Sequence, residues 1–248
     1  MIKNTIVLVI CLLSVNQLLA QYLVGPRLNY GLSQFSYDKQ NTTEDNSKFA
    51  NVYGIGGIYN FEVTPKYSLH LEANFEKRVK KTNEITYNNW HIEVPALLRL
   101  SFKAKNKLMG AHRMYVNAGP YIGYWLRGKA NLNFTDNDST IDTTVDVKFS
   151  GSSEGNLRVN SANRVQYGLA AGFGFMIPTL QDQYFMLDFR YYLGGSFIAD
   201  DAIFESGNVE FNDSLRGNYQ VISVSVAYLF NIDVIPSKKG KSTIKRRR

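Results

Sequence analysis

Apolar and polar residues alternate with a period of two along most of the chain. In residues 67–76, the sequence YSLHLEANFE places Tyr, Leu, Leu, Ala and Phe on one face and Ser, His, Glu, Asn and Glu on the other. Successive side chains of a β-strand point to opposite faces, whereas a helix would mix these two sets. Residues 90–102, 185–193 and 222–230 alternate in the same way. The pattern therefore predicts strands, and no helical segment competes with them.

Four further runs complete a set of eight predicted strands. The eight are residues 22–37, 48–63, 67–76, 90–102, 114–134, 162–177, 185–193 and 222–230. Short links follow the second, fourth and sixth strands at residues 64–65, 103–113 and 178–182. Long polar links lie at residues 38–47, 135–161 and 200–216, whereas the link near Asn83 is tight. Short connections at one end and long ones at the other are typical of outer-membrane barrels. We therefore predict an all-β fold, an eight-stranded antiparallel up-and-down transmembrane barrel with short periplasmic turns and longer extracellular loops.

The polar faces of these strands carry charges of both signs, which we expect to meet across a narrow lumen. The candidates for lumen ion pairs are Arg27, Glu72, Glu76, Glu93, Arg99, Asp188 and Arg190. Gly168, Gly172 and Gly174 would leave room for large side chains beside them. Such a barrel would be plugged by its own side chains. A soluble lipocalin-like barrel, with its apolar side chains inside, remains the alternative, because alternation alone does not say which face is outside.

The N-terminal residues resemble a secretory signal peptide. Lys3 precedes an apolar run from Ile6 to Leu13, and Ala20 ends the segment. An uncleaved anchor helix is the alternative, but the run is short for about 30 Å of hydrocarbon. We expect residues 1–20 to be the signal, residues 21–232 the barrel and residues 233–248 a basic periplasmic tail. The predicted location is the cell outer membrane.

The net charge of +7 is concentrated at the C-terminal end. By topology this end and the link after the fourth strand share the periplasmic side. The predicted basic patch there consists of Lys103, Lys105, Lys107, Lys238, Lys239, Lys241, Lys245, Arg246, Arg247 and Arg248. An exported chain does not meet nucleic acid, so we expect outer-membrane lipid and other envelope or secretion-machinery proteins as partners.

Candidate chemistry is sparse. Ser68, His70 and Glu72 share one strand face, but neighbours on that face lie about 6.6 Å apart along the strand, which strains a catalytic relay. The acidic residues of the loop 136–142 lack the glycine and closing glutamate of an EF-hand. The glycines of residues 168–174 lie within a strand and not before a helix, unlike a phosphate-binding loop. We therefore predict no catalytic residues, no cofactor and no metal site.

Several motifs resemble the PorT family of small outer-membrane barrels. They are VPALLRL at residues 94–100, NAGPYIG at 117–123, YLFN at 228–231 and the tail KKGKS at 238–242. The resemblance implies a non-enzymatic accessory component of protein secretion across the outer membrane, in type IX secretion and gliding motility. A small porin or structural outer-membrane protein and an outer-membrane lipid-modifying enzyme remain as alternatives.

Overall fold

The computed structural model describes residues 21–37, 47–106, 110–136, 139–179, 183–206 and 209–232, and these form twelve β-strands. No helix in these ranges has the length and apolar character needed to cross a membrane. The strands are β1 (Gln21–Tyr37), β2 (Ala50–Glu62), β3 (Tyr67–Lys81), β4 (Ile85–Asn106), β5 (Gly110–Asp136), β6 (Ser139–Lys148), β7 (Leu157–Asn160), β8 (Val165–Pro178), β9 (Tyr184–Gly194), β10 (Asp201–Ser206), β11 (Val209–Ser214) and β12 (Gly217–Ile232).

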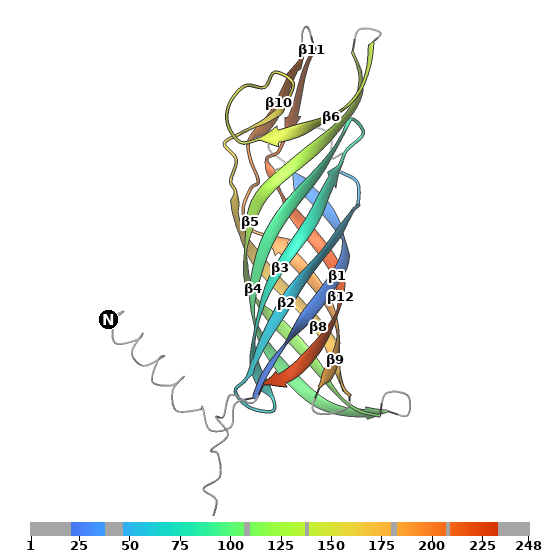
Figure 1. The fold of residues 1–248 in the computed structure, drawn as a ribbon, viewed down its shortest axis with the longest axis vertical. Coiled ribbons are helices and arrows are strands. Elements are labelled where there is room, and N and C mark those ends of the chain that lie inside the picture. The colour runs from blue at the N-terminus through green and yellow to red at the C-terminus, as the bar shows by residue number, and fades with distance from the viewer. Residues whose placement is uncertain are drawn as a thin grey trace, which may run out of the picture.

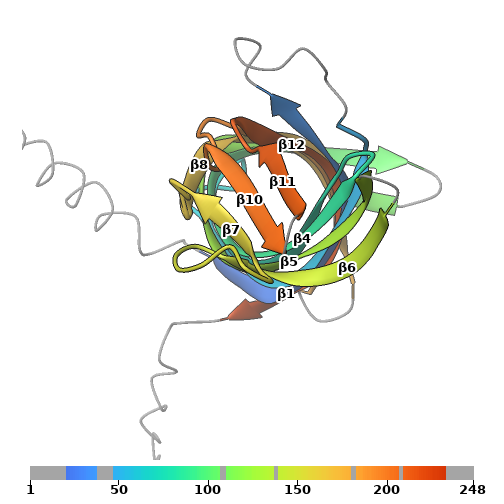
Figure 2. The same ribbon diagram turned by 90° about the horizontal axis from the view of Figure 1, so that it is seen from above.

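Eight of these strands close into a barrel (Figures 1 and 2). They follow the order β1, β2, β3, β4, β5, β8, β9 and β12, and β12 pairs with β1 to close the ring. Every pair in the ring is antiparallel, which confirms the predicted architecture. The register around the ring leads from Tyr22 back to Leu32, ten residues further along β1. This stagger requires tilted strands, as Figure 1 shows.

The barrel strands are longer than the alternation predicted. The predicted turn at residues 103–113 is wrong, because the β4–β5 ladder continues through Lys103 opposite Arg113 to Asn106 opposite Gly110. At the other end of the barrel, β3 reaches Lys81 and β4 starts at Ile85. These extensions have polar residues on both faces, so they resemble loops in sequence while their backbone groups still pair.

The long links predicted at residues 135–161 and 200–216 contain a second set of strands. Strands β6, β7, β10 and β11 extend the sheet from the upper half of β5, with β6 and β7 parallel. Apolar residues of these strands, among them Val145, Leu157 and Phe204, pack in one core with inward-facing residues of the barrel strands such as Phe35 and Leu97. Seen from above, β10 and β11 lie across the mouth of the barrel (Figure 2). We refer to these four strands as the extracellular cap.

Apolar side chains of the barrel point outward and charged ones inward. Leu98 is 72% exposed and Leu169 62%, whereas Arg27 is 1% exposed and Asp188 fully buried. A soluble barrel has the opposite arrangement. The exposed apolar band fits acyl chains, and it excludes the lipocalin-like alternative.

Candidate functional site

The centre of the barrel is filled by a charged network around Glu72 on β3. Arg190 on β9 donates from both terminal nitrogens to the two carboxylate oxygens of Glu72, each at 2.9 Å. Arg27 on β1 forms an ion pair with the same carboxylate. His70 Nε2 lies 2.6 Å from Glu72 Oε1, and Asn74 Nδ2 donates to Oε2 over 3.0 Å. One carboxylate therefore joins three strands through the barrel axis.

Asp188 on β9 is the second acidic centre of this layer. Arg190 Nη2 lies 2.8 Å from its Oδ1. The Tyr115 hydroxyl and the Asn117 amide on β5 donate to its Oδ2 at 2.8 Å and 3.0 Å. Arg190 thus bridges Glu72 and Asp188, which ties β5 into the same network.

A second layer lies one step closer to the cap and is organised by Arg78. This guanidinium forms ion pairs with Glu76, at 3.0 Å, and with Glu93. Asn29 Nδ2 donates to Glu76 Oε1 over 2.8 Å. Arg78 was not among the sequence candidates, although it lies in phase with Glu72 and Glu76. The predicted strand ends at Glu76, two residues before Arg78, whereas β3 continues to Lys81.

Arg99 lies in the lumen without joining these carboxylate layers. Its guanidinium carbon is 3.9 Å from the centroid of the Tyr115 ring. Its terminal nitrogens lie 3.3 Å from Met176 Sδ, 3.4 Å from Met186 Sδ and 3.3 Å from His70 Nε2. The other six predicted residues all take part in ion pairs. A weakly hydrated guanidinium stacks well on aromatic faces, which accounts for this environment.

A third contact connects the barrel mouth to the cap, beyond the apolar band that ends at Phe75 on β3. Lys80 Nζ lies 2.7 Å from Asp213 Oδ2, and the Tyr87 hydroxyl donates to the same oxygen over 2.6 Å. Burial lowers the pKa of Lys80, and the Asp213 carboxylate opposes this shift. Burial and Asp213 both raise the pKa of Tyr87, so its hydroxyl stays protonated and able to donate. Asp213 therefore connects the cap to the barrel mouth, in addition to the apolar core that the two share.

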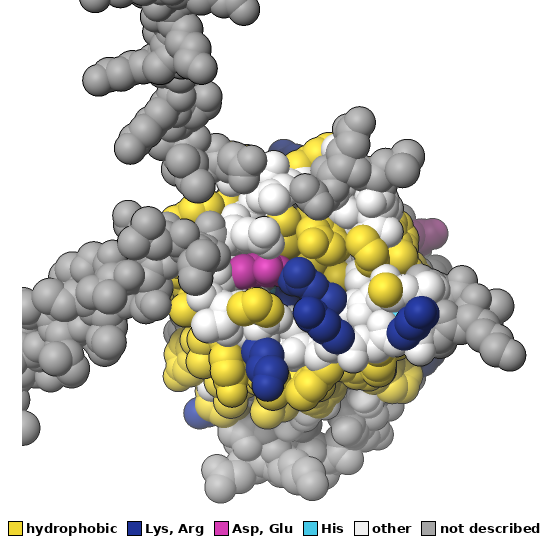
Figure 3. Space-filling model, turned by 90° about the horizontal axis from the view of Figure 1, so that it is seen from below, with side chains coloured by type: hydrophobic (Ala, Val, Ile, Leu, Met, Phe, Trp, Pro, Cys, Tyr) yellow, Lys and Arg dark blue, Asp and Glu magenta, His cyan; other side chains and the backbone are white. Residues whose placement is uncertain are grey.

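The periplasmic end is basic where it is described. Arg113 binds Glu62 over 2.8 Å and lies 5.4 Å from the centre of the Tyr184 ring. Lys103 and Lys105 are exposed on the protruding end of β4, and lysine and arginine side chains gather on this face (Figure 3). Lys107 and the predicted tail, residues 233–248, lie outside the described residues, as does the predicted signal segment.

The three residues that the sequence places on one strand face, Ser68, His70 and Glu72, are buried inside the barrel. His70 engages Glu72 and Asn60 at its two ring nitrogens, and the buried Ser68 lies on the same inward face. No group of three His, Cys, Asp or Glu side chains suited to a metal ion occurs within the described ranges. Apart from Arg99, the buried charged residues described in the lumen form ion pairs with one another.

A comparison with protein families identifies the family of the chain. Residues 17–195 match the family described as outer membrane protein beta-barrel domain. The chain belongs to this family. No curated protein matches the chain.

Solved outer-membrane barrels are similar at low identity. OprG of Pseudomonas aeruginosa is 12% identical, with 85% of this chain and 96% of OprG covered and a TM-score of 0.45. Neisserial surface protein A is 11% identical, with 85% of this chain and 99% of the Neisserial protein covered and a TM-score of 0.42. Ail of Yersinia pestis is 12% identical, with 84% of this chain and 98% of Ail covered and a TM-score of 0.36.

Proposed function

We propose that this outer-membrane barrel is a non-enzymatic accessory of protein secretion across the outer membrane and acts through its two ends. The filled lumen is the observation that carries the proposal. Arg27, Glu72, Asp188 and Arg190 are each at most 3% exposed at the barrel centre. An eight-stranded barrel has an interior only wide enough for side chains, so a passage would require these ion pairs to separate. The surfaces that remain for contact with partner proteins are the cap and the periplasmic end.

The periplasmic end supplies a surface of suitable chemistry for an envelope partner. Lys103 and Lys105 project from the extended β4–β5 ladder, beyond the apolar band. An exposed basic group on a rigid ladder favours an acidic protein partner through long-range attraction. The resemblance of the chain to the PorT family supports a partner in the secretion machinery.

A deletion strain tests the proposal. We expect secretion of carboxy-terminally tagged cargo, and gliding where the bacterium glides, to fail and to return with the wild-type gene. A gene encoding Lys103→Glu together with Lys105→Glu should restore secretion poorly, and so should one lacking residues 238–248. The matched control is Lys48→Glu with Lys81→Glu, which makes the same charge change at two exposed positions at the cap end of the barrel. Normal secretion in the deletion strain would refute the secretion role, and full rescue by both periplasmic variants would refute docking at this end.

Conductance separates the proposal from the porin alternative. In planar bilayers we expect no channel current from the purified barrel, because ion pairs fill its cross-section. Steady single-channel steps from folded protein would instead show a water-filled lumen, and the chain would then act as a small porin.

A further inference from the structure

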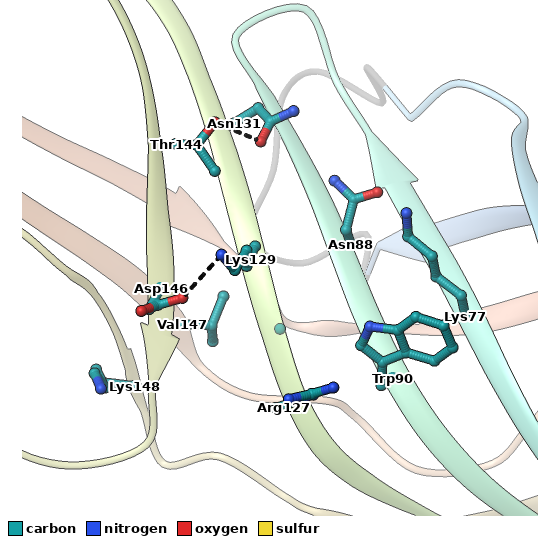
Figure 4. A pocket seen from close by; sticks show the side chains of 11 residues that line it. Lys77, Asn88, Trp90, Arg127, Lys129, Asn131, Thr144, Asp146, Val147 and Lys148 are labelled. Carbon is teal, nitrogen blue, oxygen red and sulfur yellow. Dashed lines mark hydrogen bonds and ion pairs between the residues drawn. The ribbon is translucent and has the colours of Figure 1, made fainter.

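An open pocket of about 630 Å³ lies on the outer surface of β3, β4, β5 and β6, just beyond the apolar band (Figure 4). Its lining includes four cationic side chains and one half-buried indole. These residues are Lys77, Arg127, Lys129, Lys148 and Trp90. Asp146 is the one acid among the described residues that line it, and its carboxylate lies 3.9 Å from Lys129 Nζ. The pocket therefore has an excess of positive charge.

A β-bulge creates this cationic row. The register between β4 and β5 shifts between Trp90, opposite Arg127, and His91, opposite Trp125, so Leu126 is the extra residue. Below the bulge, Ile122 and Tyr124 point outward; above it, the outward positions are Arg127 and Lys129. A bulge changes the phase of a strand by one residue. Without it, Gly128 and Ala130 would face outward and the two cations would point into the barrel.

An apolar groove across β1, β2, β3 and β4 adjoins the pocket at Trp90. This groove has a volume of about 390 Å³ and is lined by Leu28, Tyr53, Ile55, Phe75 and Trp90, among others. Trp90 belongs to both the pocket and the groove, and its ring stacks on Phe75 at 4.8 Å. Lys77 Nζ lies 5.6 Å from the centre of the Tyr53 ring, which also connects the two parts.

We propose that this pocket and groove bind a phosphate-bearing lipid of the outer leaflet. The phosphate lies among Lys77, Arg127 and Lys129, and an acyl chain follows the groove past Trp90. Cations at the edge of the apolar band face the headgroup layer, where an interfacial indole is also favoured. A soluble polyanion would use the cations and leave the apolar groove unoccupied. The continuity of the two parts therefore favours a lipid.

Purified barrel in phosphatidylcholine nanodiscs, with and without lipid A, provides the test. Retention of lipid A is measured by native mass spectrometry and, in a Trp125→Phe background, by the change in Trp90 emission. Lys77→Gln with Arg127→Gln and Lys129→Gln should weaken binding about a hundredfold, since each cation near an anionic surface contributes separately. Lys66→Gln with Lys103→Gln and Lys105→Gln removes the same charge at the other end and should leave binding unchanged.

Two further variants keep the outcome interpretable. Arg127→Gln alone changes one exposed side chain, and it should weaken lipid A binding without affecting folding, as judged by heat-dependent gel migration. Ile55→Ser changes only the groove and should also weaken lipid A binding. Binding that survives the triple substitution would overturn the proposal. Equal binding of inositol hexaphosphate, with no effect of Ile55→Ser, would show that the site takes a free polyanion and not a lipid.

Discussion

Arg190 and Glu72 form a bidentate ion pair across the full width of the barrel. Their strands, β9 and β3, are four places apart in a ring of eight, so they lie on opposite walls. Both hydrogen bonds measure 2.9 Å, and both side chains are fully buried. A bidentate guanidinium–carboxylate pair has a fixed geometry. The pair therefore acts as a strut that holds two walls of the barrel at a defined separation.

Glu72→Gln should destabilise the barrel by about 3–5 kcal/mol, because it leaves Arg27 and Arg190 buried without their common carboxylate. Urea unfolding in lipid vesicles measures the change. The control is Lys129→Gln, which breaks an exposed pair with Asp146 and should cost less than about 1 kcal/mol. Equal stabilities of the two variants would show that the central network contributes no more than a surface ion pair.

Gly174→Val should disturb the lumen through Tyr115. A Cβ at Gly174 would lie 2.3 Å from the Leu187 carbonyl oxygen and 2.4 Å from the Tyr115 hydroxyl, which donates to Asp188. We expect a loss of about 1–3 kcal/mol, the usual cost of overpacking. Gly57→Val is the matched control, because a Cβ there meets nothing within 4 Å. Similar unfolding midpoints for both variants would contradict the close approach of Tyr115 to β8.

Asp213→Asn should loosen the cap. The substitution removes the carboxylate that receives Lys80 and Tyr87, and it leaves Lys80 buried without that partner. We expect faster protease cleavage in the β10–β11 hairpin of vesicle-embedded protein while the barrel stays folded. Asp146→Asn, which alters an exposed pair on the cap, should leave the cleavage rate unchanged. A wild-type rate in Asp213→Asn would show that this contact does not hold the cap.

The sequence predicted the number of barrel strands because lipid on one side and packed charges on the other impose strict alternation on each strand. It could not predict which charges meet. Glu72 and Arg190 are brought together by ring closure, and Arg78 lies beyond the apolar band, where alternation no longer marks the strand. The bulge at Trp90 could not be predicted for a related reason. An extra residue in β5 interrupts the alternation, and the sequence alone does not show that this interruption turns Arg127 outward. Strands β7, β10 and β11 resemble loops in sequence because a core shared with the barrel mouth, and not lipid, sets their pattern.

The two tryptophans allow the inside-out orientation to be tested directly. Trp90 faces outward on β4, whereas Trp125 is fully buried inside the barrel on β5. The two lie at nearly the same height, because Trp125 pairs with His91, the residue after Trp90. The chain has two tryptophans, so Trp125→Phe and Trp90→Phe each leave a single fluorophore. Quenching by lipids brominated near the headgroup should be strong for Trp90 and absent for Trp125. Strong quenching of Trp125 with Trp90 unaffected would contradict a barrel whose charges lie inside and whose apolar surface faces the membrane.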